Sequence, residues 1–161
     1  MKHIRTRLFG IILSFIMLIS LLPVTALAGE AAWDGTTVDT NWYDDNTSAT
    51  EFTISDSADL AGLAELGNAG NSFSGKTIKL GADIDLGGKE WTPIGMSGKP
   101  FQGIFDGAKS DGSGNYTISN LTVNQPYKND MGLFGYTTGG QVKNFTLNNA
   151  KVTGYLDVGA G

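Results

Sequence analysis

The chain has 161 residues, a formal net charge of −5 and no cysteine. This length suits one domain with a sizeable core but hardly two, and the acidic balance argues against nucleic acid and anionic lipid as partners. Without cysteine there is no disulfide framework, so stability must come from packing or from repetition of a structural unit.

The first 28 residues follow the three-part pattern of a secretory signal peptide. Lys2, Arg5 and Arg7 precede a long apolar run, and residues 26–28 (ALA) end the segment with the small residues of a cleavage site. A membrane anchor, the alternative, needs about 20 apolar residues and does not normally end in this way. The pattern predicts cleavage after Ala28 and an exported, extracellular or cell-surface chain that is not an integral membrane protein.

Cleavage would remove the only His and both Arg residues, because His3, Arg5 and Arg7 all lie in this leader. The remaining 133 residues (161 − 28) carry 8 Lys and 16 acidic residues, a formal charge of −8. Without His and Cys there is no ordinary zinc site, no Ser-His-Asp triad and no thiolate nucleophile. Without Arg there is no bidentate clamp for carboxylate or phosphate. We therefore expect no enzyme, cofactor or metal, with carboxylate or Lys chemistry as the remaining route to catalysis.

Residues 29–55 are polar and rich in Asp and Thr, and they predict an irregular arm laid over a core. Their acidic residues resemble a calcium loop in composition but lack the D-x-D-x-D-G spacing, so turn chemistry is expected; these residues are Asp34, Asp39, Asp44 and Asp45. Trp33, Trp42 and Trp91 could stack on sugars, although large aromatic residues near the end of a repeat domain more often plug it.

One helix is predicted at about residues 57–67. Asp56 can cap it, Asp59 lies near its positive end, and Gly67 and Gly70 end it. Its apolar face predicts a cover for the N-terminal edge of the domain, near Ile78 and Leu80; this face consists of Leu60, Leu63, Ala64 and Gly67.

From residue 76 onward the sequence shows only strand and turn signals. In residues 76–86 (KTIKLGADIDL) apolar and polar positions alternate, so one face is expected to be buried along the whole run. Asp83 and Asp85 lie on the outward face, with Cα atoms about 6.6 Å apart by strand rise. Such a pair suits a glycoside hydrolase or a calcium site, but a solvated face needs no partner and is the expectation.

A seven-residue pattern occurs twice, as ISNLTVN at 118–124 and as VKNFTLN at 142–148, 24 positions later. The spacing of apolar residues shifts at Asn120, which indicates a corner, and Asn tolerates the left-handed backbone that corners use. We predict that Asn120 lies under Asn144, with Cα atoms about 4.8 Å apart and bonded side chains. The same register places Ile118 under Val142 and Leu121 under Phe145.

A second similarity links DMGLFG at 130–135 with DVGAG at 157–161, and GIFDG at 103–107 resembles both. Passes of 24 to 29 residues that differ in loop length fit an all-β fold of the parallel β-helix type over residues 56–161. The alternative is a β-sandwich with chance similarity.

At these residues the sequence resembles bacterial surface proteins with GLUG motifs. The match covers residues 132–154, with the motif at Gly132, Leu133, Phe134 and Gly135, and residues 73–95 and 101–107 resemble the family's lead-in. The resemblance implies a right-handed β-helix on a bacterial cell surface, often within a long adhesin-like or S-layer-associated protein. GLUG-type repeats would span about 130–161 and stop at VGAG, where the family continues. Neither a sorting signal nor an HExxH motif is present.

These observations favour a non-enzymatic surface repeat domain that presents a binding face or acts as a spacer. Its partners would be host or bacterial surface glycans or proteins. The alternatives are a carbohydrate-binding module and a carboxylate-dependent glycoside hydrolase. Because no cover is evident for the C-terminal edge, the sequence also predicts self-association through residues 142–161.

Overall fold

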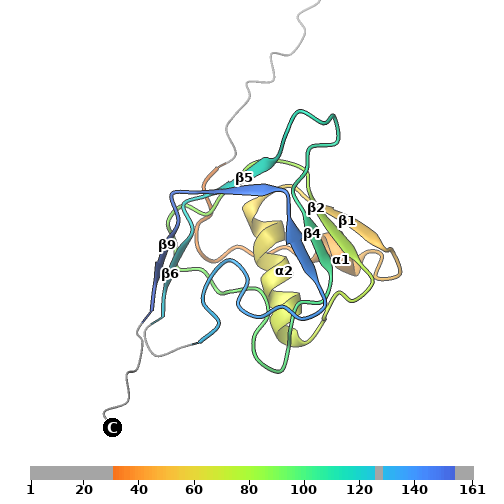
Figure 1. The fold of residues 1–161 in the computed structure, drawn as a ribbon, viewed down its shortest axis with the longest axis horizontal. Coiled ribbons are helices and arrows are strands. Elements are labelled where there is room, and N and C mark those ends of the chain that lie inside the picture. Colours follow the sequence, from red (N-terminus) through yellow and green to blue (C-terminus); the bar gives the residue numbers. More distant parts are fainter. Residues whose placement is uncertain (1–30, 126–128, 155–161) are drawn as a thin grey trace, which may run out of the picture.

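The computed structural model describes residues 31–125 and 129–154. The predicted signal peptide and the segment 157–161 lie outside the described residues. Most of the secondary structure is strand, arranged in parallel sheets, and the helices are few, so the chain is all-β in class (Figure 1).

Two helices and nine strands are formed by the described residues. The helices are α1 (Asn41–Asp44) and α2 (Ser57–Ala69). The strands are β1 (Glu51–Ile54), β2 (Thr77–Leu80), β3 (Ile84–Asp85), β4 (Ile104–Asp106), β5 (Tyr116–Ser119), β6 (Thr122–Asn124), β7 (Gln141–Lys143), β8 (Phe145–Asn148) and β9 (Lys151–Thr153).

The strands form three sheets, in the orders β1-β2-β4-β7, β3-β5-β8 and β6-β9, and every pairing between them is parallel. The chain runs through the sheets in turn, and we call each such circuit a pass. The first pass supplies β1, and the second supplies β2 and β3. The third pass supplies β4, β5 and β6, and the last pass supplies β7, β8 and β9. Each strand of the last pass therefore lies beside the corresponding strand of the third. These parallel pairings do not fit the antiparallel sheets of a β-sandwich.

The core lies between the sheets and is filled by alternate strand residues. In the first sheet, the inward-facing residues Phe52, Ile78 and Phe105 are aligned by the strand register and are all buried. In the second, Ile84 pairs with Ile118, and both are buried. Aromatic rings also contact one another between passes: the centroid of Phe101 lies 6.1 Å from that of Phe73 and 5.1 Å from that of Phe134.

Helix α2 packs against this core, as predicted. Its residues Leu60, Leu63 and Ala64 belong to the same buried cluster as the strand residues, and in the view of Figure 1 the helix lies inside the outline formed by β4, β5 and β6. The Asp56 side chain accepts a hydrogen bond from the Asp59 backbone nitrogen at 2.8 Å, which confirms the predicted cap. The helix ends later than predicted: Gly67 is a buried helical residue, and Gly70, with φ of 118°, forms the left-handed C-cap.

Two local expectations need correction. Within residues 29–55, predicted to be irregular, β1 pairs with β2, and α1 forms one helical turn. The alternation of 76–86 is real, but the run is not one strand, because the chain turns between β2 and β3 and leaves Ala82 half-buried. Both differences arise because tertiary pairing, rather than local pattern, decides where short strands begin and end.

The predicted stacking of Asn120 under Asn144 is wrong. Both residues have φ of 58°, so both form the expected left-handed corners. However, β5 pairs with β8 so that Tyr116 lies beside Phe145 and Ile118 beside Leu147. Val142 lies beside Phe105 instead of Ile118. The two similar sequences therefore occupy different corners: Asn120 separates β5 from β6, and Asn144 separates β7 from β8.

Candidate functional site on the last pass

Side-chain amides and carboxylates connect neighbouring passes at the corners. Asn149 Nδ2 donates to Asn120 Oδ1 at 2.6 Å, and Asn120 Nδ2 donates to Asp85 Oδ1 at 2.7 Å. Asn149 has φ of 50°, so it repeats the left-handed corner of Asn120. We call this row of Asp85, Asn120 and Asn149 the corner ladder. It provides the Asn ladder that the sequence predicted, with Asn149 in place of Asn144.

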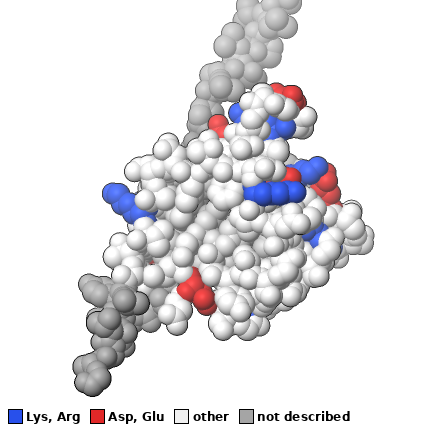
Figure 2. Space-filling view, in the orientation of Figure 1, with Lys and Arg blue, Asp and Glu red and all other residues white. Residues whose placement is uncertain are grey.

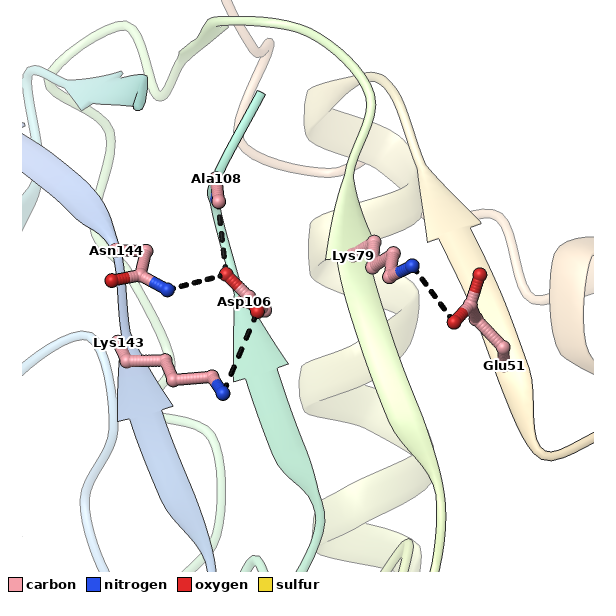
Figure 3. A network of polar contacts seen from close by, with 6 residues as sticks. All are labelled: Glu51, Lys79, Asp106, Ala108, Lys143 and Asn144. Atoms are coloured by element: carbon pink, nitrogen blue, oxygen red, sulfur yellow. Dashed lines mark hydrogen bonds and ion pairs between the residues drawn. The ribbon is translucent and has the colours of Figure 1, made fainter. Parts of the chain in front are cut away.

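A second corner is built from the same groups on the first sheet (Figure 3). Asn144 Nδ2 donates to Asp106 Oδ1 at 2.9 Å, and Lys143 Nζ lies 3.6 Å from Asp106 Oδ2. Partial burial raises the pKa of Asp106. The hydrogen bonds from Asn144 and from the Ala108 backbone, together with Lys143, lower this pKa by more than burial raises it, so the pKa lies below its ordinary value. This carboxylate is therefore held ionised to help fix the last pass on the third.

The apolar strand residues of the last pass are exposed, unlike those beneath them. Val142 is 39% exposed, Leu147 42% and Val152 49%. Their register partners on the third pass, Phe105, Ile118 and Val123, are 0% exposed. Since β7, β8 and β9 each end their sheet, their outer edges have no strand partner among the described residues. Figure 2 shows a face with few charged side chains in this orientation. We call this surface the open end.

The GLFG segment precedes β7 and closely contacts an earlier pass. Leu133 is buried, and its carbonyl accepts hydrogen bonds from Trp91 Nε1 at 3.1 Å and from the Ile94 nitrogen at 2.9 Å. The Gly135 nitrogen donates to the Ile94 carbonyl at 2.9 Å. A Cβ atom on Gly135 would lie only 2.5 Å from the Gly95 carbonyl oxygen, so glycine is required by this close approach.

The partner of the GLFG segment was missed by the sequence analysis. The structure pairs Phe134 with Ile94, whereas GIFDG at 103–107 contains β4 and pairs with β7. The available signal was the apolar-Gly pair in both segments, Ile94-Gly95 and Phe134-Gly135. Gly132, with φ of 151°, precedes this contact and adopts a backbone that other residues rarely use.

Several of the acidic residues proposed for catalysis or calcium binding accept structural hydrogen bonds. Asp83 Oδ1 accepts one from the Thr117 nitrogen at 2.7 Å, while Asp85 belongs to the corner ladder. In the arm, Asp34 accepts from the Thr37 side chain and from the backbone of Thr37 and Thr36, and these bonds hold the pKa of Asp34 far below its usual range. Within residues 31–125 and 129–154, no group of three or more acidic residues is placed to hold a metal ion.

Two of the three tryptophans meet beside α2. The ring centroids of Trp33 and Trp91 lie 5.5 Å apart in an edge-to-face arrangement, next to a hollow of about 340 Å³. Trp33 is only 8% exposed and Trp91 only 1%, so their rings offer little surface for a sugar to stack on. Trp42 instead stacks on Phe73, with centroids 6.2 Å apart. The rings act mainly as core residues near the helix.

Comparison with known proteins gives one similarity. The chain is 33% identical to halomucin of Haloquadratum walsbyi (strain DSM 16790 / HBSQ001) over 139 residues, which is 78% of this chain but only 1% of halomucin. No family model matches the chain, and no solved structure matches it either. Among the described residues, no helix is long and apolar enough to cross a membrane.

Proposed function

We propose that this chain contributes a right-handed parallel β-helix module to an exported, surface-associated repeat protein of the GLUG type, with α2 as its N-terminal cap. The three parallel sheets support this, because the strands of each pass pair with the strands of the pass before it in the same sheets. Parallel strands of one sheet are joined by right-handed connections in almost all proteins, which favours that hand here. The similarity to halomucin, of which the 139 matched residues make up only 1%, supports a place within a much longer protein.

The module acts by presenting a surface or by spacing other parts of a longer protein. The observation that carries this proposal is the open end, where three apolar residues and three strand edges lie ready for further contact. The contacts of the carboxylates favour a structural role over a catalytic one, since Asp83, Asp85 and Asp106 all accept hydrogen bonds from the following pass. Surface glycans or proteins of the host or of neighbouring bacteria are the proposed partners.

The arrangement of passes is tested by paired cysteines in a chain that has none of its own. Ser119 lies beside Asn148 in the register, so Ser119→Cys with Asn148→Cys should form an intramolecular disulfide under mild oxidation. Thr117→Cys with Asn148→Cys is the matched control, because these residues lie two positions out of register. Equal cross-linking in both variants would contradict the proposed stacking.

Surface association and binding need separate measurements. Protease treatment of intact cells should release fragments of the full protein without lysis, and protection equal to that of a cytoplasmic marker would contradict surface exposure. A glycan array then separates a binding module from a spacer. A saturable signal identifies a glycan partner, whereas its absence with folded protein leaves the spacer function. The buried rings of Trp33 and Trp91 favour the second result.

A further inference from the structure

The tripeptide Asn-x-Ser/Thr, which is the acceptor motif for N-linked glycans in exported proteins, occurs four times in the sequence. Its copies begin at Asn46, Asn115, Asn120 and Asn144. A glycan needs an exposed amide nitrogen, because the saccharide is bulky and becomes bonded to that atom. The fold therefore decides which of the four Asn residues can be modified in the folded chain.

At two of the four copies, the amide belongs to a corner that connects neighbouring passes. Asn120 Nδ2 donates to Asp85 Oδ1 at 2.7 Å, and Asn144 Nδ2 donates to Asp106 Oδ1 at 2.9 Å. A glycan on either nitrogen would compete with the Asp of the earlier pass for the same space, so the folded corner opposes modification. The corner sequence of Asn, an apolar residue and Thr therefore produces this motif for a structural reason.

The copy at Asn115 begins on the surface but continues into a strand. Asn115 is exposed and ends the loop before β5, which projects from the body of the molecule in Figure 1. Thr117, the hydroxyl residue of this copy, is half-buried in β5, and its backbone nitrogen donates to Asp83 Oδ1 at 2.7 Å. The motif requires the hydroxyl residue as well as the Asn, so an enzyme would have to open the sheet to reach both.

The copy at Asn46 is exposed along its whole length. Asn46, Thr47 and Ser48 lie in the turn between α1 and β1, and all three are exposed. The Ser48 hydroxyl donates to Asn46 Oδ1 at 2.8 Å, and Asn46 Nδ2 makes no hydrogen bond within the described part of the chain. Lys76 Nζ donates to the carbonyls of Thr47 and Ala49 at 2.8 and 2.7 Å and so holds the turn in place. This copy alone therefore presents both its amide and its hydroxyl to an enzyme.

We propose that Asn46 carries an N-linked glycan in the exported protein, and that the other three Asn residues of the motif stay unmodified. The inference rests on the proposed export. The donor is a saccharide joined through diphosphate to a polyprenyl lipid. Asn46 Nδ2 bonds to the anomeric carbon of this saccharide while the bond from that carbon to the diphosphate oxygen breaks. The lipid diphosphate leaves with the electron pair of that bond, and a base of the transferring enzyme takes one proton from Nδ2.

Trypsin separates the relevant sites, because it cuts after the Lys residues of the exported chain. Asn46 falls in the peptide 29–76, Asn115 and Asn120 fall in 110–128, and Asn144 falls in 144–151. Mass spectrometry should be applied to the full protein, purified from the cells that export it. We expect saccharide mass on the peptide 29–76 and none on the other two peptides.

Substitutions at exposed positions then test the acceptor itself. Asn46→Gln removes the amide that the motif requires, and Ser48→Ala removes the hydroxyl, so both variants should lose the saccharide mass from the peptide 29–76. Ser48→Thr restores a hydroxyl and should keep this mass. Asn115→Gln, at an exposed Asn of the same motif, is the matched control and should leave it unchanged. Circular dichroism checks that each variant is folded.

Four results would overturn the proposal. Exported protein that begins at residue 29 and has an unmodified peptide 29–76 would contradict the glycan and leave the export intact. Saccharide mass that persists in Asn46→Gln would place the saccharide on a Ser or Thr oxygen. Saccharide on Asn120 or Asn144 would show that the fold does not select the site. A chain that stays inside the cell with its leader uncut would contradict the export, and with it the glycan.

Discussion

Replacement of Asn120 separates the two roles that the structure gives this residue. Its backbone has φ of 58°, and its side chain connects Asp85 to Asn149 in the corner ladder. Asn120→Gly removes the side-chain bonds but keeps a residue that tolerates the left-handed backbone. Asn120→Ala removes the same bonds and adds a residue that does not tolerate it. The difference between the two variants measures the backbone role alone.

The expected magnitudes follow from these contacts. A hydrogen bond contributes about 1 kcal/mol, or about 1.5–3 kcal/mol when one partner is charged, as Asp85 is. Because Asn120 is only half-buried, water replaces part of what is lost, and we expect Asn120→Gly to lower the free energy of unfolding by about 2 kcal/mol. Asn120→Ala should cost about 1 kcal/mol more, since a left-handed backbone disfavours a residue with a Cβ atom.

Urea denaturation followed by circular dichroism measures both changes. Asn144 supplies the control: it has the same φ of 58° but donates to Asp106 from an exposed position. Asn144→Gly should cost under about 1 kcal/mol, while Asn144→Ala should show the same added backbone cost as at Asn120. Equal stabilities of the Gly and Ala variants at both corners would refute the backbone reasoning. Loss of less than about 0.5 kcal/mol in Asn120→Gly would refute the role of the ladder.

Three further predictions concern the helix and the first sheet. Leu63→Asp should lower the free energy of unfolding by about 3 kcal/mol, and Leu66→Asp by less, because Leu63 is 0% exposed and Leu66 is half-buried; thermal melts check the order. Gly62→Ala should destabilise the chain, since its Cβ would lie 1.9 Å from a backbone oxygen of the arm, whereas Gly67→Ala, with no atom nearer than 3.8 Å, should raise the unfolding free energy by about 0.5–1 kcal/mol in urea titrations. The pKa of Asp106 lies below its ordinary value of 3.8 in the folded chain, so its stabilising effect is present above that value and is lost as pH falls through the lowered pKa. Asp106→Asn should therefore lose less stability than the parent between about pH 5 and pH 2, and parallel losses would contradict this role.

Local features of the fold were predictable from the sequence because their causes are local. The Asp56 cap and the apolar face of α2 depend on residues within one or two turns of the helix. The burial of Ile78, Leu80 and Ile84 follows from alternation along the chain. The corner at Asn120 follows from a shift in that alternation at a residue that tolerates the left-handed backbone.

The register could not be predicted because it depends on loop lengths between passes. The repeated pattern occurs at a spacing of 24 residues, but β5 and β8 pair at a spacing of 29, as Ile118 and Leu147 show. A left-handed Asn followed by an apolar residue occurs at three corners, at Asn120, Asn144 and Asn149, so the pattern identifies corners without saying which one. The contact of Gly135 with Gly95 was missed for a related reason, because close approach of two backbones leaves only a pair of small residues in the sequence.

The corner residues also follow an order that their chemistry explains. Asp85 and Asp106 each lie one pass before the Asn that donates to them, Asn120 and Asn144 respectively, and Asn149 lies one pass after Asn120. The Oδ1 atom of each Asp accepts one hydrogen bond from the backbone nitrogen two residues later and one from the Asn of the next pass. An Asn in the middle of a ladder must donate to the earlier pass and accept from the later one, which a carboxylate cannot do. A ladder of this polarity therefore begins with Asp and continues with Asn, so the identity of the corner residue gives the direction in which the passes are stacked.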